Sequence, residues 1–178
     1  LVGGGGGLVE ASSLHEAVER RFLASGHPRN ITCIHALGIG DRKERGMNRF
    51  AHSGMTRRVI GGHWVWSPRM QQMARDNEIE AYVLPGGVIM QLMREVAAGR
   101  PGLITHVGLG TFVDPRHGGG RMNDAACDDL SEVITIDDRD YLRYLPIPVS
   151  VALLRGSYAD EDGNISMEEE PANLDVYA

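Results

Sequence analysis

The order of helical and strand-like patterns is the feature that most constrains the fold of this chain. Some segments repeat apolar residues every three or four positions, and others are short, apolar and rich in β-branched residues. The helical segments are residues 14–26, 67–77 and 85–99, and the strand segments are residues 30–37, 59–63, 79–84 and 103–109. Strands that alternate with helices of this length predict an open α/β fold with a mostly parallel sheet and helices on both faces.

Beyond residue 110 the alternation stops. Residues 111–120 form a long glycine-containing loop without a regular period, and residues 124–131 are compatible with a helical turn. The remaining apolar segments pair around polar turns, which predicts two C-terminal β-hairpins. The first joins residues 132–136 to 141–145, and the second joins residues 149–155 to 165–167. A further short helix is expected over residues 48–55.

Five consecutive glycines stand near the start of the chain: Gly3, Gly4, Gly5, Gly6 and Gly7. Because glycine has no side chain and tolerates positive φ, such a run can turn several backbone N–H groups toward one anion. The helical pattern that follows suggests that the glycines open a helix, whose N-terminus also favours negative charge. The alternative is a flexible linker or a cloning remnant.

Glycine pairs also lie at the ends of the predicted strands. They are Gly38 and Gly40, Gly61 and Gly62, Gly86 and Gly87, and Gly108 and Gly110. The carboxyl ends of parallel strands form the usual ligand-binding edge of such sheets. Backbone N–H groups placed there suit phosphates or a carbonyl that becomes an oxyanion, although ordinary turns explain each pair equally well. His63, next to Gly62, is a candidate cleft residue.

Composition and motifs exclude several classes of function. A net charge of −6 in 178 residues argues against nucleic-acid binding, and there is no apolar run long enough for a membrane helix. Cys33 and Cys127 have neither disulfide-framework nor zinc spacing, and the histidines lack metal-site spacing. The chain contains no phosphate-binding P-loop and no Gly-x-Ser-x-Gly motif, and Gly108-x-Gly110 lacks the third glycine of a dinucleotide fingerprint. Cytoplasmic localisation is the expectation.

Several stretches, in order along essentially the whole chain, resemble the N-terminal half of family I CoA-transferases, closest to the propionate/acetate CoA-transferase branch. They are Gly38-Ile39-Gly40-Asp41-Arg42 with Arg45-Gly46, Arg58-Val59-Ile60-Gly61-Gly62-His63-Trp64, Asn77-x-Ile79-x-Ala81-Tyr82, Ala97-Ala98-Gly99-x-Pro101-Gly102 and Val107-Gly108-Leu109-Gly110-Thr111-Phe112-Val113-Asp114-Pro115-Arg116. The resemblance implies a CoA-transferase-type α/β fold and one N-terminal-type domain over residues 1–178.

The resemblance also implies a reaction. Family members move CoA between short-chain carboxylic acids through a glutamyl-CoA thioester, with acyl-CoA and a carboxylic acid as substrates and no metal or redox cofactor. The implied contacts to CoA or to the oxyanion are Gly3, Gly4, Gly5, Gly6, Gly7, Gly86, Gly87, Gly108, Gly110 and Thr111. A homo-oligomer is also expected, and the sequence does not indicate which acids react.

Two departures from the family pattern bear on activity. The nucleophilic glutamate of the family lies in a C-terminal half, in a motif that this chain lacks, so no catalytic residue is expected here. Gly86 stands where the family usually has a glutamine that helps to hold the oxyanion. The chain is therefore expected to be a fragment of a longer polypeptide or one subunit of two. The alternatives are a non-catalytic acyl-CoA-binding module and an acyl-CoA hydrolase on the same fold.

Overall fold

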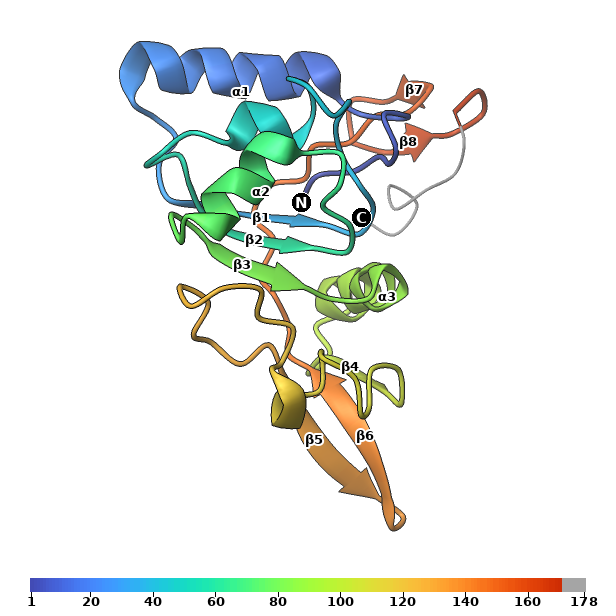
Figure 1. Ribbon diagram of the computed structural model, residues 1–178. Coiled ribbons are helices and arrows are strands. Elements are labelled where there is room, and N and C mark those ends of the chain that lie inside the picture. Colours follow the sequence, from blue (N-terminus) through green and yellow to red (C-terminus); the bar gives the residue numbers. More distant parts are fainter. Residues whose placement is uncertain (171–178) are drawn as a thin grey trace.

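A computed structural model describes residues 1–170 (Figure 1). The helices are α1 (Ser12–Ser25), α2 (Pro68–Arg75) and α3 (Gly86–Ala97), with short 3-10 helices η1 (Met47–Phe50) and η2 (Pro115–His117). The strands are β1 (Ile31–His35), β2 (Thr56–Gly61), β3 (Glu80–Val83), β4 (Leu103–Thr105), β5 (Ser131–Ile136), β6 (Arg139–Tyr144), β7 (Tyr158–Ala159) and β8 (Ile165–Ser166). No helix within residues 1–170 is long and apolar enough to cross a membrane.

The first three strands form a parallel sheet in the order β1-β2-β3. Cys33, Val59 and Ala81 are aligned across it, and the next residue of each strand is aligned in turn. Because successive side chains of a strand point to opposite faces, the aligned rows supply two separate apolar surfaces. The parallel sheet predicted from the strand and helix order is confirmed.

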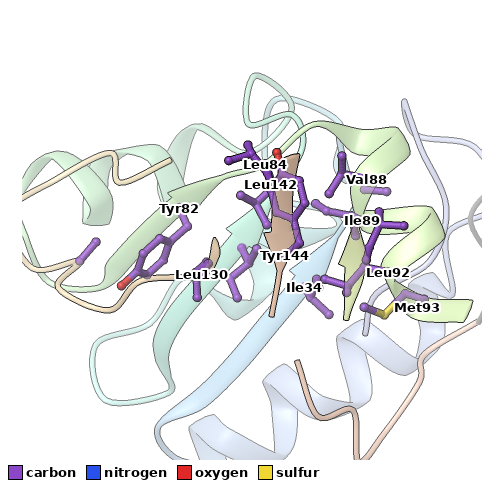
Figure 2. Packing of buried hydrophobic residues seen from close by; sticks show 14 residues of the cluster. Ile34, Tyr82, Leu84, Val88, Ile89, Leu92, Met93, Leu130, Leu142 and Tyr144 are labelled. Carbon is purple, nitrogen blue, oxygen red and sulfur yellow. The ribbon is translucent and has the colours of Figure 1, made fainter. Parts of the chain in front are cut away.

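Helices cover both of these surfaces. The row of Cys33, Val59 and Ala81 packs with apolar residues of α2 and η1 and with the inner side of α1. The opposite row, which includes Ile34 and Tyr82, packs against α3 and against Leu142 and Tyr144 of β6 (Figure 2). The prediction of helices on both faces is therefore confirmed, with α1 and α3 on opposite sides of the sheet (Figure 1).

The predicted strand over residues 103–109 was wrong in length and in partner. β4 has only three residues and pairs antiparallel with β6 in a second sheet of order β4-β6-β5. The free edge of β3 is already occupied, because the Val83 N–H donates to Gly120 O at 2.8 Å and the Met122 N–H donates to Ala81 O at 2.9 Å. A segment without any strand pattern thus takes the place expected for β4.

The C-terminal hairpins are confirmed in part. β5 and β6 pair along their whole length around Asp137 and Asp138, whose φ angles of 48° and 61° match the backbone of a two-residue hairpin turn. The second hairpin consists of β7 and β8 alone. Residues 149–155 were expected as its first strand, but they lie beside the N-terminal residues, where Leu153 N donates to Leu1 O at 2.9 Å.

Two helical expectations are confirmed only in part. A helix was expected over residues 48–55, but only residues 47–50 are helical, and they form the 3-10 helix η1. Residues 124–131 contain no helix, only a turn at their start, which is closed by a hydrogen bond from Ala126 N to Asn123 O at 3.2 Å.

An apolar cavity of about 370 Å³ lies along the outer edge of β1, between that strand and residues 147–151. It is separate from the carboxyl ends of the strands.

Candidate functional site

The loops that follow β1, β2 and β3 meet at the carboxyl edge of the parallel sheet. The carbonyl oxygen of Ala36, just after β1, lies so close to Gly62 and Gly86 that a Cβ on either would press against it, at 2.8 Å in the case of Gly86. Gly38 is packed in the same way against the side chains of Trp66 and His63, with the His63 ring nitrogen Nδ1 2.6 Å from its Cβ position. These glycines are required because the loops approach closely.

The five-glycine run joins this edge, but its N–H groups have partners within the chain. Gly3 N donates to Leu153 O at 3.0 Å, Gly5 N to Leu8 O at 2.9 Å, and Gly6 N to Gly38 O at 2.6 Å. In this conformation an anion could use these donors only by displacing a carbonyl oxygen. The run also does not open the helix directly, because α1 begins at Ser12. Ligand binding by these glycines stays a prediction.

Glu10 is a site residue that the sequence analysis did not identify. Its side chain is buried, and its carboxylate oxygen Oε1 accepts a hydrogen bond from Gly40 N at 2.6 Å. Burial raises the pKa of Glu10, while hydrogen bonds from the N–H groups of Gly40 and Gly7 act in the opposite direction. Glu10 thereby ties the glycine run to the loop after β1. The only sequence signal was a single acidic residue three positions after the end of the run.

Two histidines at this edge have different environments. His35, the last residue of β1, is buried, and its ring Nδ1 lies 2.7 Å from Leu37 O. Burial lowers the pKa of His35 to about 4, helped by the nearby His63. His35 is therefore a strand residue with one ring nitrogen satisfied by a backbone carbonyl. His63 is exposed among the glycine loops and stays a candidate for function.

Gly86 and Gly87 begin α3 at the same edge. Nothing lies within 4 Å of the position that a Cβ on Gly87 would take, whereas Gly86 faces the Ala36 carbonyl. A side chain at position 86 therefore requires this carbonyl to move. The N-terminus of α3 presents backbone at this point and no side-chain donor.

The other predicted site residues, Gly108, Gly110 and Thr111, lie in the loop after β4. Asp114, fully buried, accepts hydrogen bonds from Gly110 N at 2.9 Å and from Arg116, whose guanidinium holds the pKa of the Asp114 carboxyl well below its usual range. Thr111 Oγ1 donates to Gly108 O at 2.8 Å. The structure thus divides the predicted residues into two groups, one at the parallel sheet and one beside the antiparallel sheet (Figure 1).

The model of the coenzyme A transferase family matches residues 1–178. The chain belongs to the coenzyme A transferase family. Within residues 1–170 of this CoA-transferase chain, no three His, Cys, Asp or Glu side chains are grouped so that they could hold a metal ion.

Individual CoA-transferases are similar over most of the chain. The acetate CoA-transferase YdiF of Escherichia coli K12 is 38% identical over 176 residues, which are 99% of this chain and 33% of YdiF. The caffeate CoA-transferase of Acetobacterium woodii is 44% identical over 154 residues, which are 86% of this chain and 29% of that enzyme. The chain thus spans about a third of the length of these relatives.

Solved structures show the same fold. Crystal structures of the acyl-CoA transferase YdiF from Escherichia coli O157:H7, as the apoenzyme and as a thioester complex with CoA, superimpose with a TM-score of 0.90 at 39% identity. The superposition covers 95% of this chain and 33% of YdiF. The CoA-transferase fold implied by the sequence resemblance is confirmed.

Proposed function

We propose that this chain is the N-terminal half of a CoA-transferase that moves CoA between short-chain carboxylic acids. The observation that carries the proposal is the glycine-lined carboxyl edge of the parallel sheet, in a chain whose fold matches YdiF at a TM-score of 0.90. The glycines let the three loops approach closely, and open space at Gly87 leaves the backbone at the start of α3 accessible to a thioester carbonyl.

The proposed reaction is double displacement on a glutamate. A carboxylate oxygen of the glutamate attacks the acyl-CoA carbonyl carbon, and the C–S bond breaks to give a mixed anhydride and CoA thiolate. The thiolate attacks the glutamyl carbonyl, releases the acyl group as its carboxylate, and forms a glutamyl-CoA thioester. A second acid reverses these steps and leaves as a new acyl-CoA. The thioester complex named for YdiF supports this chemistry, which itself requires no resident metal or redox cofactor.

The nucleophilic glutamate is proposed to come from a C-terminal half, in the same polypeptide or as a second subunit. Glu10, the buried carboxylate at the carboxyl edge, is unsuited to the role because it already accepts backbone N–H bonds and burial favours its neutral form. In the proposal, the backbone at Gly86 and Gly87 contributes to oxyanion stabilisation, and the Gly3–Gly7 and Gly108–Thr111 segments contribute to acyl-CoA binding.

A second candidate is a non-catalytic acyl-CoA-binding module. It is favoured by Gly86, which supplies no side-chain donor to an oxyanion. Loss of one such donor costs about 10²–10³ in rate in characterised enzymes.

The test is the mass of the purified protein under denaturing conditions, before and after incubation with propionyl-CoA. We expect a CoA adduct on a polypeptide that carries a C-terminal half, and its loss when acetate is added. An adduct on a 19.4 kDa species, the mass of this chain, would refute the assignment of the glutamate. Thiol release without an acceptor acid would indicate a hydrolase, and binding of propionyl-CoA without adduct or thiol release would indicate the binding module.

A further inference from the structure

Backbone strain is concentrated at the carboxyl edge of the parallel sheet. Among residues 1–170, four of the non-glycine residues with positive φ are Asn or Asp, which tolerate this conformation in turns. The others are Val9, at 56°, and Arg42, at 65°. Val9 follows the glycine run, and Arg42 follows Gly40, so both lie in loops that meet at this edge. Unfavourable conformations of this kind persist where the surrounding structure imposes them, and they are enriched at ligand sites.

The conformation of Arg42 places its guanidinium over an aromatic ring. The guanidinium carbon lies 4.6 Å from the centroid of the Trp66 ring, and the backbone N–H of Arg42 donates to Trp66 O at 3.0 Å. The two loops are joined further, since Ser67 Oγ donates to Ile39 O at 2.6 Å and Asn48 Nδ2 donates to Trp66 O at 3.2 Å. Arg42 is therefore held against Trp66 by its own backbone and by the packing of both loops.

Within the described part of the chain, no carboxylate neutralises the charge of Arg42. In residues 1–170, ion pairs are formed by Arg49, Arg58 and Arg116, among others, but no carboxylate lies within ion-pair distance of Arg42. The neighbouring Asp41 is engaged elsewhere, because its Oδ1 accepts the N–H groups of Lys43, Glu44 and Arg45, each at 2.9 Å. A positioned guanidinium thus remains exposed at the edge where the glycine loops meet.

We propose that Arg42, stacked on Trp66, binds the paired anionic oxygens of a substrate at this edge. Its planar fork fits a carboxylate or a phosphate, so the ligand is either the carboxylate of the acid substrate or a phosphate of CoA. Exposed apolar side chains come from the same meeting loops: Leu8 directly follows the glycine run, and Val65 lies in the loop after β2. They suit the alkyl group of a short carboxylic acid. This inference rests on the proposed function, because it assigns a residue of the same site.

A fluorescence titration tests binding without requiring activity. Trp64 and Trp66 are the two tryptophans of the chain, so Trp64→Phe leaves Trp66 as the reporter. We expect sodium propionate or sodium phosphate, at constant ionic strength, to change Trp66 fluorescence with saturation. Arg42→Gln is expected to weaken this binding by about tenfold to a hundredfold, the usual effect of losing a hydrogen bond to a charged group. Lys43→Gln, which removes the same charge from the next residue, is expected to leave it unchanged.

Steady-state kinetics of the active enzyme provide a second test that does not depend on Trp64→Phe. If the ligand is the acid, Arg42→Gln raises KM for acetate by about tenfold or more and leaves KM for propionyl-CoA unchanged. If it is a CoA phosphate, KM for propionyl-CoA rises, and the effect disappears with the 3′-dephospho form. Arg42→Lys is expected to restore part of the loss because the charge returns without the fork.

The two proposals fail in distinguishable ways. If Arg42→Gln and Lys43→Gln have the same anion affinity in the titration and the same KM values in the kinetics, the role of Arg42 is overturned and the transferase proposal is left intact. A saturable signal that requires Arg42, in a protein without transferase activity, would support the anion site and refute the transferase proposal.

Discussion

Gly86 and Gly87 are adjacent glycines with different surroundings, and they allow a matched prediction. A Cβ on Gly86 would lie 2.8 Å from the Ala36 carbonyl oxygen, whereas a Cβ on Gly87 would meet nothing within 4 Å. Gly86→Ala is expected to lower the free energy of unfolding by about 1–3 kcal/mol because of this overpacking. Gly87→Ala is expected to leave it unchanged or to raise it by up to about 1 kcal/mol. Urea denaturation of both variants measures the difference, and equal midpoints would contradict the close approach of these loops.

His15 makes stability depend on pH. It is fully buried in α1, and among residues 1–170 neither of its ring nitrogens has a hydrogen-bond partner. Its ring packs edge-on against Phe50 with centroids 5.5 Å apart. Burial lowers its pKa from 6.5 to about 4, helped by the charge of Arg49. Since the unfolded chain binds the proton more tightly, the stabilising contribution is complete above pH 6.5 and is lost as the pH falls toward 4.

The expected loss from His15 between pH 7.5 and pH 5 is about 2 kcal/mol of unfolding free energy. His15→Leu should remove this part of the pH dependence, whereas His117→Gln, at an exposed position, should retain it. The measurement is urea denaturation at both pH values. A pH dependence of His15→Leu as steep as that of the unsubstituted chain would show that His15 is not the group responsible.

At the scale of secondary-structure elements, α3 is held by its apolar face. Leu92 is fully buried among the residues that join α3 to the sheet (Figure 2). Leu92→Ala is expected to lower the free energy of unfolding by about 2–5 kcal/mol because it removes buried methyl groups and leaves a cavity. Leu23→Ala is the control, because Leu23 of α1 is 66% exposed, and it should change stability by less than about 0.5 kcal/mol. Chemical denaturation compares them, and similar costs would contradict the assignment of these faces.

At the scale of the whole molecule, the two apolar clusters lie on opposite faces of one three-stranded sheet. Neither face can be exposed without disturbing strands that the other also uses, so we expect the clusters to unfold together. Met70→Ala in one cluster and Leu92→Ala in the other should each shift tryptophan fluorescence and far-UV circular dichroism to a common lower midpoint. Separate midpoints by the two probes would indicate two independently unfolding regions.

The sequence by itself determined the elements whose patterns are local. The spacing of apolar residues in α3, the Ser-Pro start of α2 and the β-branched residues of β1 and β2 are readable without a structure. Their alternation was sufficient for the parallel sheet with helices on both faces, because few other arrangements bury such elements. The ordered motifs from Gly38 to Arg116 were sufficient for the family.

Only the tertiary structure decided which backbone edges and polar groups are already occupied. No local pattern shows that Gly120 and Met122 pair with β3 and exclude β4, or that Leu153 and Gly38 accept the N–H groups of the glycine run. The same holds for Glu10 and Gly40, separated by 30 residues, and for the contact of Arg42 with Trp66. These contacts join segments that are distant in the sequence. The packing of the loops therefore decides which hydrogen-bond partner each polar group finds.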